Sequence, residues 1–156
     1  MMNNCSNSII DNLIKISNQK TDNLREISDE EILTLIKAAR LAPSADNSQI
    51  SRFLILHNEA IRERLLSEIL KTSKKYNRVI VALAAPFIIR HIRREQPFYA
   101  IDVPIAISHI MLQGLELGIK TDLFFVFENR EIESLLNIPE KYKLVAVMGL
   151  NRYANK

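Results

Sequence analysis

Residues 43–49, with the sequence PSADNSQ, hold the densest group of side chains that could bind a ligand. Ser44 and Ser48 supply hydroxyls, and Asn47 and Gln49 supply amides. These groups can donate and accept hydrogen bonds at a planar polar ring without adding charge. The composition is equally typical of a well-capped loop without a ligand, because the same residue types favour tight turns. Ligand binding and a structural turn are both open interpretations of this segment.

The histidines and the cysteine form no pattern that predicts a metal site or a nucleophile. His57, His91 and His109 do not stand in HxxxH or HExxH spacing, and Cys5 is the only cysteine. No GxSxG segment is present, so a hydrolase triad has no anchor. No acid–base pair stands out either. We therefore assign no catalytic side chain and no metal ligand, and redox chemistry would need a cofactor to carry it.

Length and composition predict one globular domain over residues 1–156, with residues 1–8 expected to be disordered. Hydrophobic residues make up 47% of the chain and charged residues 25%, a balance typical of soluble proteins. Only three glycines occur, which argues against a glycine-rich phosphate loop. The longest apolar stretch, residues 79–89, is too short to cross a bilayer, and no secretory signal is found. We expect a cytoplasmic protein.

The charge is modestly positive, with a formal net charge of +3 and a sequence pI of about 9.1. Basic residues concentrate in residues 71–78 and 90–94. Such runs can bind nucleic acid, but no interleaved platform of aromatic residues accompanies them. Solvated surfaces are the better interpretation, and we do not expect a nucleic-acid partner.

A helix and a strand are predicted on either side of residues 43–49. Residues 28–31 (SDEE) form a capping box that begins a helix, and an apolar stripe follows in Ile32, Leu35, Ile36 and Ala39. The helix must end before Pro43, because a residue that precedes proline is pushed out of the α region. Residues 53–57 (FLILH) read as a strand. The polar segment is therefore expected to connect the two.

The rest of the chain alternates between predicted helices and strands. Asp102 is expected to cap a long helix that ends near Gly118, and residues 74–84 fit helix and strand equally well. The other expected elements are helices at 6–17, 59–70 and 130–136 and strands at 86–92, 122–127 and 144–150. This order indicates an α/β or α+β domain with helices packed on a small sheet.

Four stretches resemble the nitroreductase family, in the family's own order. Residues 38–56 (AARLAPSADNSQISRFLIL) resemble its signature loop, and residues 28–36 resemble the helix before it. Residues 101–119 resemble its central helix, and residues 136–150 resemble its closing Leu-x-Ile-Pro segment and strand. The resemblance runs from about residue 12 to 152. It implies an α+β fold with a small mixed sheet flanked by helices.

The resemblance further implies a homodimer with two sites at its interface and FMN as the cofactor. FMN would take electrons from NADH or NADPH and pass them to a nitro compound, a quinone or a related acceptor. Pro43, Ser44 and Ala45 would contact the flavin and its chain, and Asn47 and Gln49 would lie near the ring. The strongly apolar helix that begins at residue 102 also favours a dimer, because a helix that is apolar on several sides must be buried on several sides.

The chain departs from the family at the phosphate end of the expected site. The family's Arg-x-Ser-x-Arg motif corresponds to residues 16–20, where Ile16 and Lys20 replace the two arginines and Asn18 stands at the serine position. Ser17, next to Asn18, is the hydroxyl that we expect at the cofactor. Lys15 and Arg152 are the further basic residues that we expect at the phosphate. Residues 123–127 lack the glycine that many members place near the flavin. A non-catalytic dimeric homologue, in which the flavin was lost or repurposed for a binding role, is the alternative.

Overall fold

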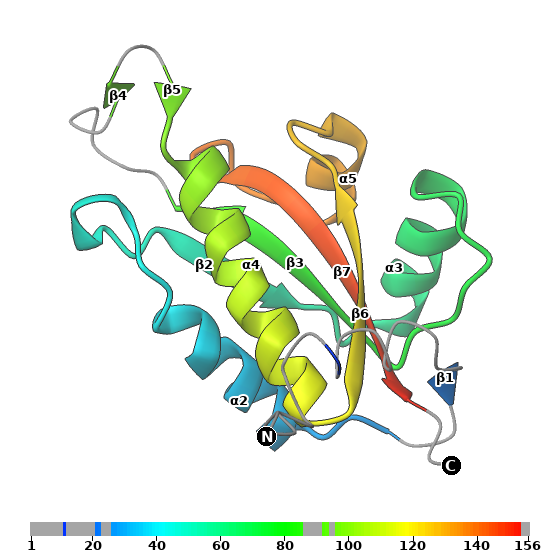
Figure 1. The fold of residues 1–156 in the computed structure, drawn as a ribbon. Coiled ribbons are helices and arrows are strands. Elements are labelled where there is room, and N and C mark those ends of the chain that lie inside the picture. The colour runs from blue at the N-terminus through cyan, green and yellow to red at the C-terminus, as the bar shows by residue number, and fades with distance from the viewer. Residues whose placement is uncertain (1–10, 12–20, 23–25, 86–91, 94–95, 154–156) are drawn as a thin grey trace, which may run out of the picture.

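The sheet of the computed structural model is built around one long strand, β7 (Lys143–Tyr153), which lies between β3 (Arg78–Ala84) and β6 (Ile119–Phe125) (Figure 1). The model describes residues 11, 21–22, 26–85, 92–93 and 96–153. β2 (Ser51–Ile55) extends the sheet beyond β3, and β1 (Thr21–Asp22) pairs with the end of β7. The α+β class is confirmed. The sheet was expected to be mixed, but every pairing between described strands is antiparallel.

Helices cover both faces of this sheet. α2 (Asp29–Arg40) and α4 (Tyr99–Glu116) pack on one face, as Figure 1 shows. The buried side chains between them and the sheet, such as Leu35, Ile107 and Met148, form the first core cluster. α3 (Glu59–Arg64), which continues into a π-helical turn at Leu65–Ile69, and α5 (Arg130–Leu135) pack on the other. Successive residues of β3 point to opposite faces, so that Ile80 and Ala82 join the first cluster and Val79 and Val81 the second.

The helix before the polar segment forms as the sequence predicts. The Ser28 side chain accepts a hydrogen bond from the backbone N–H of Glu31, and the Glu31 side chain accepts one from the backbone N–H of Ser28. This capping box satisfies amides that the first helical turn leaves without partners. Ile32, Leu35 and Ala39 are buried, and the helix ends at Arg40, before Pro43.

Pairing with neighbouring strands moves the boundaries of several predicted elements. β2 begins two residues before the expected Phe53, and β6 begins at Ile119 instead of Asp122, because both strands extend along their hydrogen-bonded partners. The ambiguous residues 74–84 contain β3. Apart from residue 11, which is helical, the predicted helix at 6–17 lies outside the described residues, as does most of the predicted strand at 86–92. At the end of that predicted strand, β4 (Ile92–Arg93) pairs with β5 (Gln96–Pro97).

The start of α4 differs from the prediction in a way that affects the site. The helix begins at Tyr99, so Asp102 lies inside its first turn and is not the cap. The backbone N–H of Asp102 already donates to Phe98 O within the helix, and its side chain is directed to a distant loop. At the other end, Gly118 follows the helix with φ +68°, the left-handed conformation that commonly ends helices at glycine.

Candidate functional site

Residues 43–49 form a compact loop between α2 and β2. Its middle is a single 3₁₀ turn, Ala45–Asn47, in which the Asn47 amide donates to Ser44 O at 3.0 Å. The Ser44 hydroxyl accepts a hydrogen bond from the backbone N–H of Gln49, also at 3.0 Å. The Gln49 side chain donates to Asn47 Oδ1 at 3.4 Å. The polar side chains that the sequence singles out therefore hold the loop in shape, and the exposed ones retain hydrogen-bonding capacity for a ligand.

Three residues of this loop have left-handed backbone conformations. The φ angles are 49° for Asp46, 53° for Asn47 and 46° for Gln49. Asparagine and aspartate tolerate this region, whereas glutamine rarely adopts it. Such strain persists only where surrounding contacts fix the chain, and it is concentrated at ligand sites. A loop with three left-handed residues in four, one of them the glutamine, is therefore consistent with binding.

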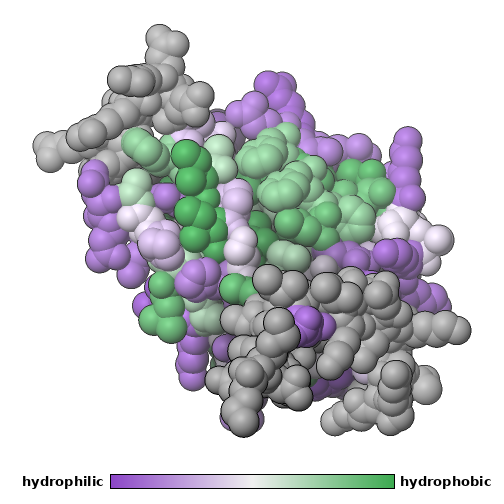
Figure 2. All heavy atoms as spheres, viewed as in Figure 1, coloured by the Kyte–Doolittle hydropathy of each residue, from purple (hydrophilic) through white to green (hydrophobic). Residues whose placement is uncertain are grey.

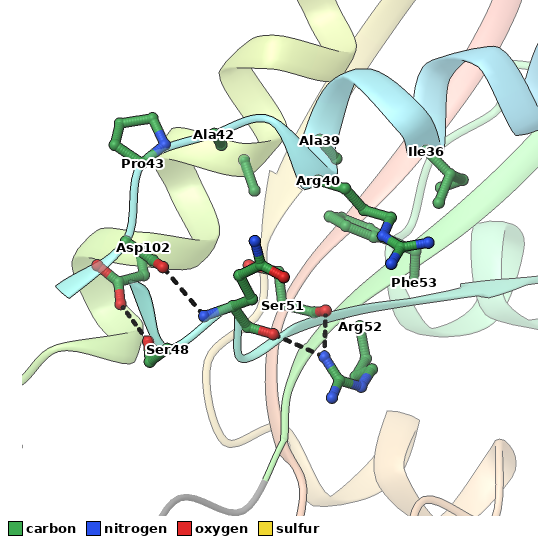
Figure 3. A pocket seen from close by; sticks show the side chains of 13 residues that line it. Ile36, Ala39, Arg40, Ala42, Pro43, Ser48, Ser51, Arg52, Phe53 and Asp102 are labelled. Atoms are coloured by element: carbon green, nitrogen blue, oxygen red, sulfur yellow. Dashed lines mark hydrogen bonds between the residues drawn. The ribbon is translucent and has the colours of Figure 1, made fainter. Parts of the chain in front are cut away.

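The contact that fixes the loop comes from Asp102 of α4, which is only 4% exposed. Its carboxylate accepts hydrogen bonds from the backbone N–H of Ala45, at 3.2 Å to each oxygen. It also accepts one from the Ser48 hydroxyl at 3.4 Å (Figure 3). Sequence reasoning missed this role because it assigned Asp102 to a helix cap. The signal was an acid set among apolar residues near the start of a largely apolar helix, because a buried carboxylate needs hydrogen-bond partners.

A cavity of about 570 Å³ opens beside the loop. One part of its wall is apolar, and another part carries hydroxyl and amide groups from the loop and from β2 (Figure 3). Two arginines, Arg40 and Arg52, complete it. The residues that line it are Ile36, Ala39, Arg40, Ala42, Pro43, Ser44, Ser48, Gln49, Ser51, Arg52, Phe53, Asp102 and Ala106.

The structure brings part of the predicted site together. Pro43, Ser44 and Gln49 line the cavity, while Ala45 and Asn47 belong to the same loop without lining it. The three N-terminal candidates, Lys15, Ser17 and Lys20, lie outside the described residues. Sequence reasoning did not single out Arg40, Arg52 or Asp102 as site residues. The one signal in the sequence for the two arginines is that they lie close to residues 43–49, one on each side.

Arg152 lies at the end of β7 and is paired with the start of α2. Its Nη2 is 2.6 Å from Glu31 Oε2, and its Nη1 donates to Leu117 O at 2.9 Å. Burial by itself raises the pKa of Glu31, but hydrogen bonds from Arg152 and Ser28 outweigh it, so the pKa is lowered. Both terminal nitrogens of Arg152 are thus engaged within the protein.

The residues of the cavity fit the ring of a flavin. The loop offers uncharged donors and acceptors around the apolar surface of Ala39, Ala42 and Phe53, which suits a flat polar heterocycle. The cation predicted for the phosphate, Arg152, is engaged by Glu31, and the cations that line the cavity are Arg40 and Arg52. Residues 123–127 contribute no glycine, and the rings of Phe125 and Phe127 stack on each other at 5.9 Å.

Neither a metal centre nor a membrane span is found in the part of the chain that the structure describes. No group of three or more histidine, cysteine, aspartate or glutamate side chains there could hold a metal ion. No described helix is long and apolar enough to cross a membrane. The described fold and cavity define an α+β domain with an open cavity lined by apolar, polar and basic side chains.

Comparison with known proteins assigns this domain to a family. The sequence model of the nitroreductase family matches residues 17–150, and the chain therefore belongs to that family. A relative from Archaeoglobus fulgidus, which carries the name NADH dehydrogenase/NAD(P)H nitroreductase, is 29% identical over 133 residues. The match covers 81% of this chain and 74% of that relative.

Solved structures with the same fold come from several clostridia. A nitroreductase family protein from Clostridium novyi NT has a TM-score of 0.80 at 22% identity, covering 96% of this chain and 87% of its own. An FMN-dependent nitroreductase from Clostridium difficile R20291 has a TM-score of 0.71 at 22% identity, covering 88% and 82%. At these identities the matches establish a shared fold.

Proposed function

We propose that this protein is an FMN-dependent oxidoreductase that passes electrons from NADH or NADPH to a nitro compound, a quinone or a related acceptor. The observation that carries the proposal is the cavity beside the strained loop of residues 43–49, in a chain that belongs to the nitroreductase family. The relative from A. fulgidus carries the name of an NAD(P)H nitroreductase, which supports the same class of reaction.

The protein's own residues would bind and orient the reactants. Ser44, Asn47 and Gln49 would make hydrogen bonds to the flavin, with Pro43 and Ala45 shaping the loop around it. Asp102 would act as a positioning residue, because it holds the Ala45 amide and so the path of the loop. Bound FMN would supply the electron-transfer chemistry, and no side chain is required as nucleophile or general acid.

The phosphate end is proposed to involve Lys15, Ser17, Lys20 and Arg152. Arg152 could take part only if its pairing with Glu31 were shared or exchanged, since both of its terminal nitrogens are in use. The Arg152→Ala variant tests this with two ligands. A loss of affinity for FMN that far exceeds the loss for riboflavin supports a phosphate contact, and equal losses place the role of Arg152 in the fold alone.

We also propose a homodimer. Large apolar side chains remain exposed on α2, after it and on α4: Leu33 is 55% exposed, Leu41 81% and Leu112 49%. Figure 2 shows apolar surface over α4 and β6, where Ile101 and Phe125 are exposed as well. Leu41 and Leu112 line one shallow groove together. A second copy that covered these side chains would remove apolar surface from water, which favours association. A monomer mass in light scattering at micromolar concentration would contradict the dimer.

The absorption spectrum of the purified protein tests the proposed function most directly. A flavin spectrum, or its recovery on addition of FMN, followed by oxidation of NADH or NADPH with a nitroaromatic or quinone acceptor, supports the enzyme. A colourless protein that takes up no FMN contradicts it. That result would favour the alternative, a non-catalytic dimeric homologue with a binding role, for which the engaged Arg152 and the glycine-free residues 123–127 are the motivating observations.

A further inference from the structure

The cavity holds two cations whose charge is not balanced by a neighbouring carboxylate. Arg40 comes from the last turn of α2 and Arg52 from β2, and both line the cavity. Among the residues that the structure describes, neither guanidinium forms an ion pair. The third charged residue of the lining, Asp102, is 4% exposed and is hydrogen bonded to the loop. The accessible charge of the cavity is therefore positive.

Arg52 is held in place by backbone contacts. Its Nη1 donates to Gln49 O at 2.8 Å and to Ser51 O at 2.9 Å. Two acceptors use both hydrogens of Nη1, and the donors of Nε and Nη2 remain. These two nitrogens form one edge of the planar group, and such an edge can bind a carboxylate through two parallel hydrogen bonds. Arg52 is thus held by two backbone contacts and keeps two donors on one edge of its guanidinium group.

Arg40 supplies the second charge. The negative end of the α2 dipole favours a cation in the last helical turn, and both Lys37 and Arg40 occur there. Only Arg40 of the two lines the cavity. Figure 3 shows the guanidinium groups of Arg40 and Arg52 on the side of the cavity away from Asp102. An anion on that side of the cavity would therefore meet these cations and not the carboxylate.

Apolar surface lies next to these cations. Ile36, Ala39 and Phe53 line the same cavity as the two arginines. A ligand that satisfies both surfaces has a flat apolar body and an anionic substituent. We propose that Arg40 and Arg52 select electron acceptors that carry a carboxylate or a similar anionic group beside an aromatic ring. This inference rests on the proposed function and specifies its acceptor.

Two probes of the same size separate charge from shape: 4-nitrobenzoate and its uncharged counterpart 4-nitrobenzamide. Isothermal titration calorimetry on the purified protein measures their binding without turnover. We expect a preference of about tenfold for 4-nitrobenzoate, the lower end for charged hydrogen bonds, because both arginines are largely exposed. R40Q and R52Q should each reduce this preference, and the double variant should abolish it. R52K, which keeps the charge without the fork, should restore only part of it.

The matched control is K37Q, which removes one positive charge from the same helix outside the cavity. It should leave the preference unchanged. Equal affinity of the native protein for the two probes, or an equal loss in K37Q, would overturn the inference. A double variant that loses FMN but keeps riboflavin would also overturn it, because the anion would then be the cofactor's phosphate.

Activity assays keep this inference separate from the proposed function. Reduction of both probes with equal KM, unchanged in R40Q and R52Q, would contradict the anion selection while leaving the enzyme class standing. No reduction of either probe or of a quinone by flavin-loaded protein with NADH or NADPH would contradict the enzyme class, and the calorimetric preference would still report on the two arginines.

Discussion

Two carboxylates, Asp102 and Glu31, each join segments that are distant in the sequence. A ligand could reach the surroundings of Asp102, whereas the surroundings of Glu31 are filled by the protein's own side chains. Asp102 is bound by a backbone amide and a hydroxyl, and an open cavity lies next to it. Glu31 is bound by Arg152 and by Ser28, and the Arg152 side chain is only 11% exposed. We call the surroundings of Asp102 the open corner, because a cavity lies next to it, and the surroundings of Glu31 and Arg152 the closed corner.

The difference bears on where a charged ligand can bind. At the closed corner the cation and the anion neutralise each other within the protein. At the open corner the carboxylate is used by the loop, and the cations Arg40 and Arg52 retain donors of their own. A basic residue that follows a family motif therefore need not be available to a ligand, and a carboxylate that is bound by neutral donors leaves neighbouring cations free.

Replacing Arg152 by alanine should have the largest effect on stability. Glu31, whose side chain is 25% exposed, would lose its cation and remain partly buried. Breaking a buried pair costs about 3–5 kcal/mol, and we expect the lower end in the free energy of unfolding measured with urea. The control is Arg64→Ala, which breaks a pair with side chains 61% and 62% exposed and should cost below about 0.5 kcal/mol. Equal effects of the two would mean that the closed corner does not stabilise the fold.

Replacing Asp102 by alanine should be the next largest change. The Ala45 amide and the Ser48 hydroxyl would lose their acceptor, at a cost of about 1–3 kcal/mol in unfolding free energy. Affinity for FMN, followed by quenching of its fluorescence, should fall as well, because the loop loses its anchor. Asp102→Asn keeps the shape and one acceptor oxygen and should retain most of both quantities. Unchanged flavin affinity in the alanine variant would remove the positioning role.

Truncation of the loop side chains should affect flavin binding more than folding. Ser44→Ala and Asn47→Gly should each weaken FMN by about 0.5–1.5 kcal/mol, the size of one hydrogen bond. Glycine is chosen at residue 47 because its φ of 53° disfavours alanine. Ser67→Ala, in the turn after α3, is the distant control. Equal FMN affinity in all three variants would show that the loop does not hold the cofactor.

The smallest expected effect is a pH dependence of stability that arises at the closed corner. Because the pKa of Glu31 is lowered in the folded protein, its contribution is present above the ordinary value of 4.5 and is lost as the pH falls through the folded pKa. The free energy of unfolding should be measured from about pH 6 to about pH 3, the range in which carboxylates titrate. In Glu31→Gln it should fall less with acid than in the native protein. An unchanged profile would assign the acid dependence to other carboxylates.

Local signals in the sequence determined the helix before the loop and the loop itself. The capping box at Ser28 and the break before Pro43 act through bonds within a few residues, so they can be predicted without knowing the rest of the fold. The polar content of residues 43–49 likewise marked the cavity wall, because Ser44 and Gln49 line it. Family motifs along the chain indicated the same architecture.

Only the tertiary structure decided which charges are available at the site. Asp102 meets Ala45 across 57 residues of sequence, and Arg152 meets Glu31 across 121. Neither pairing follows from local spacing, since packing of α4 against the loop and of β7 beside α2 brings the groups together. The exact ends of β2 and β6 were likewise set by their partner strands. The sequence determines the type of each side chain. Whether that side chain can still bind a ligand depends on the distant groups that the fold places against it.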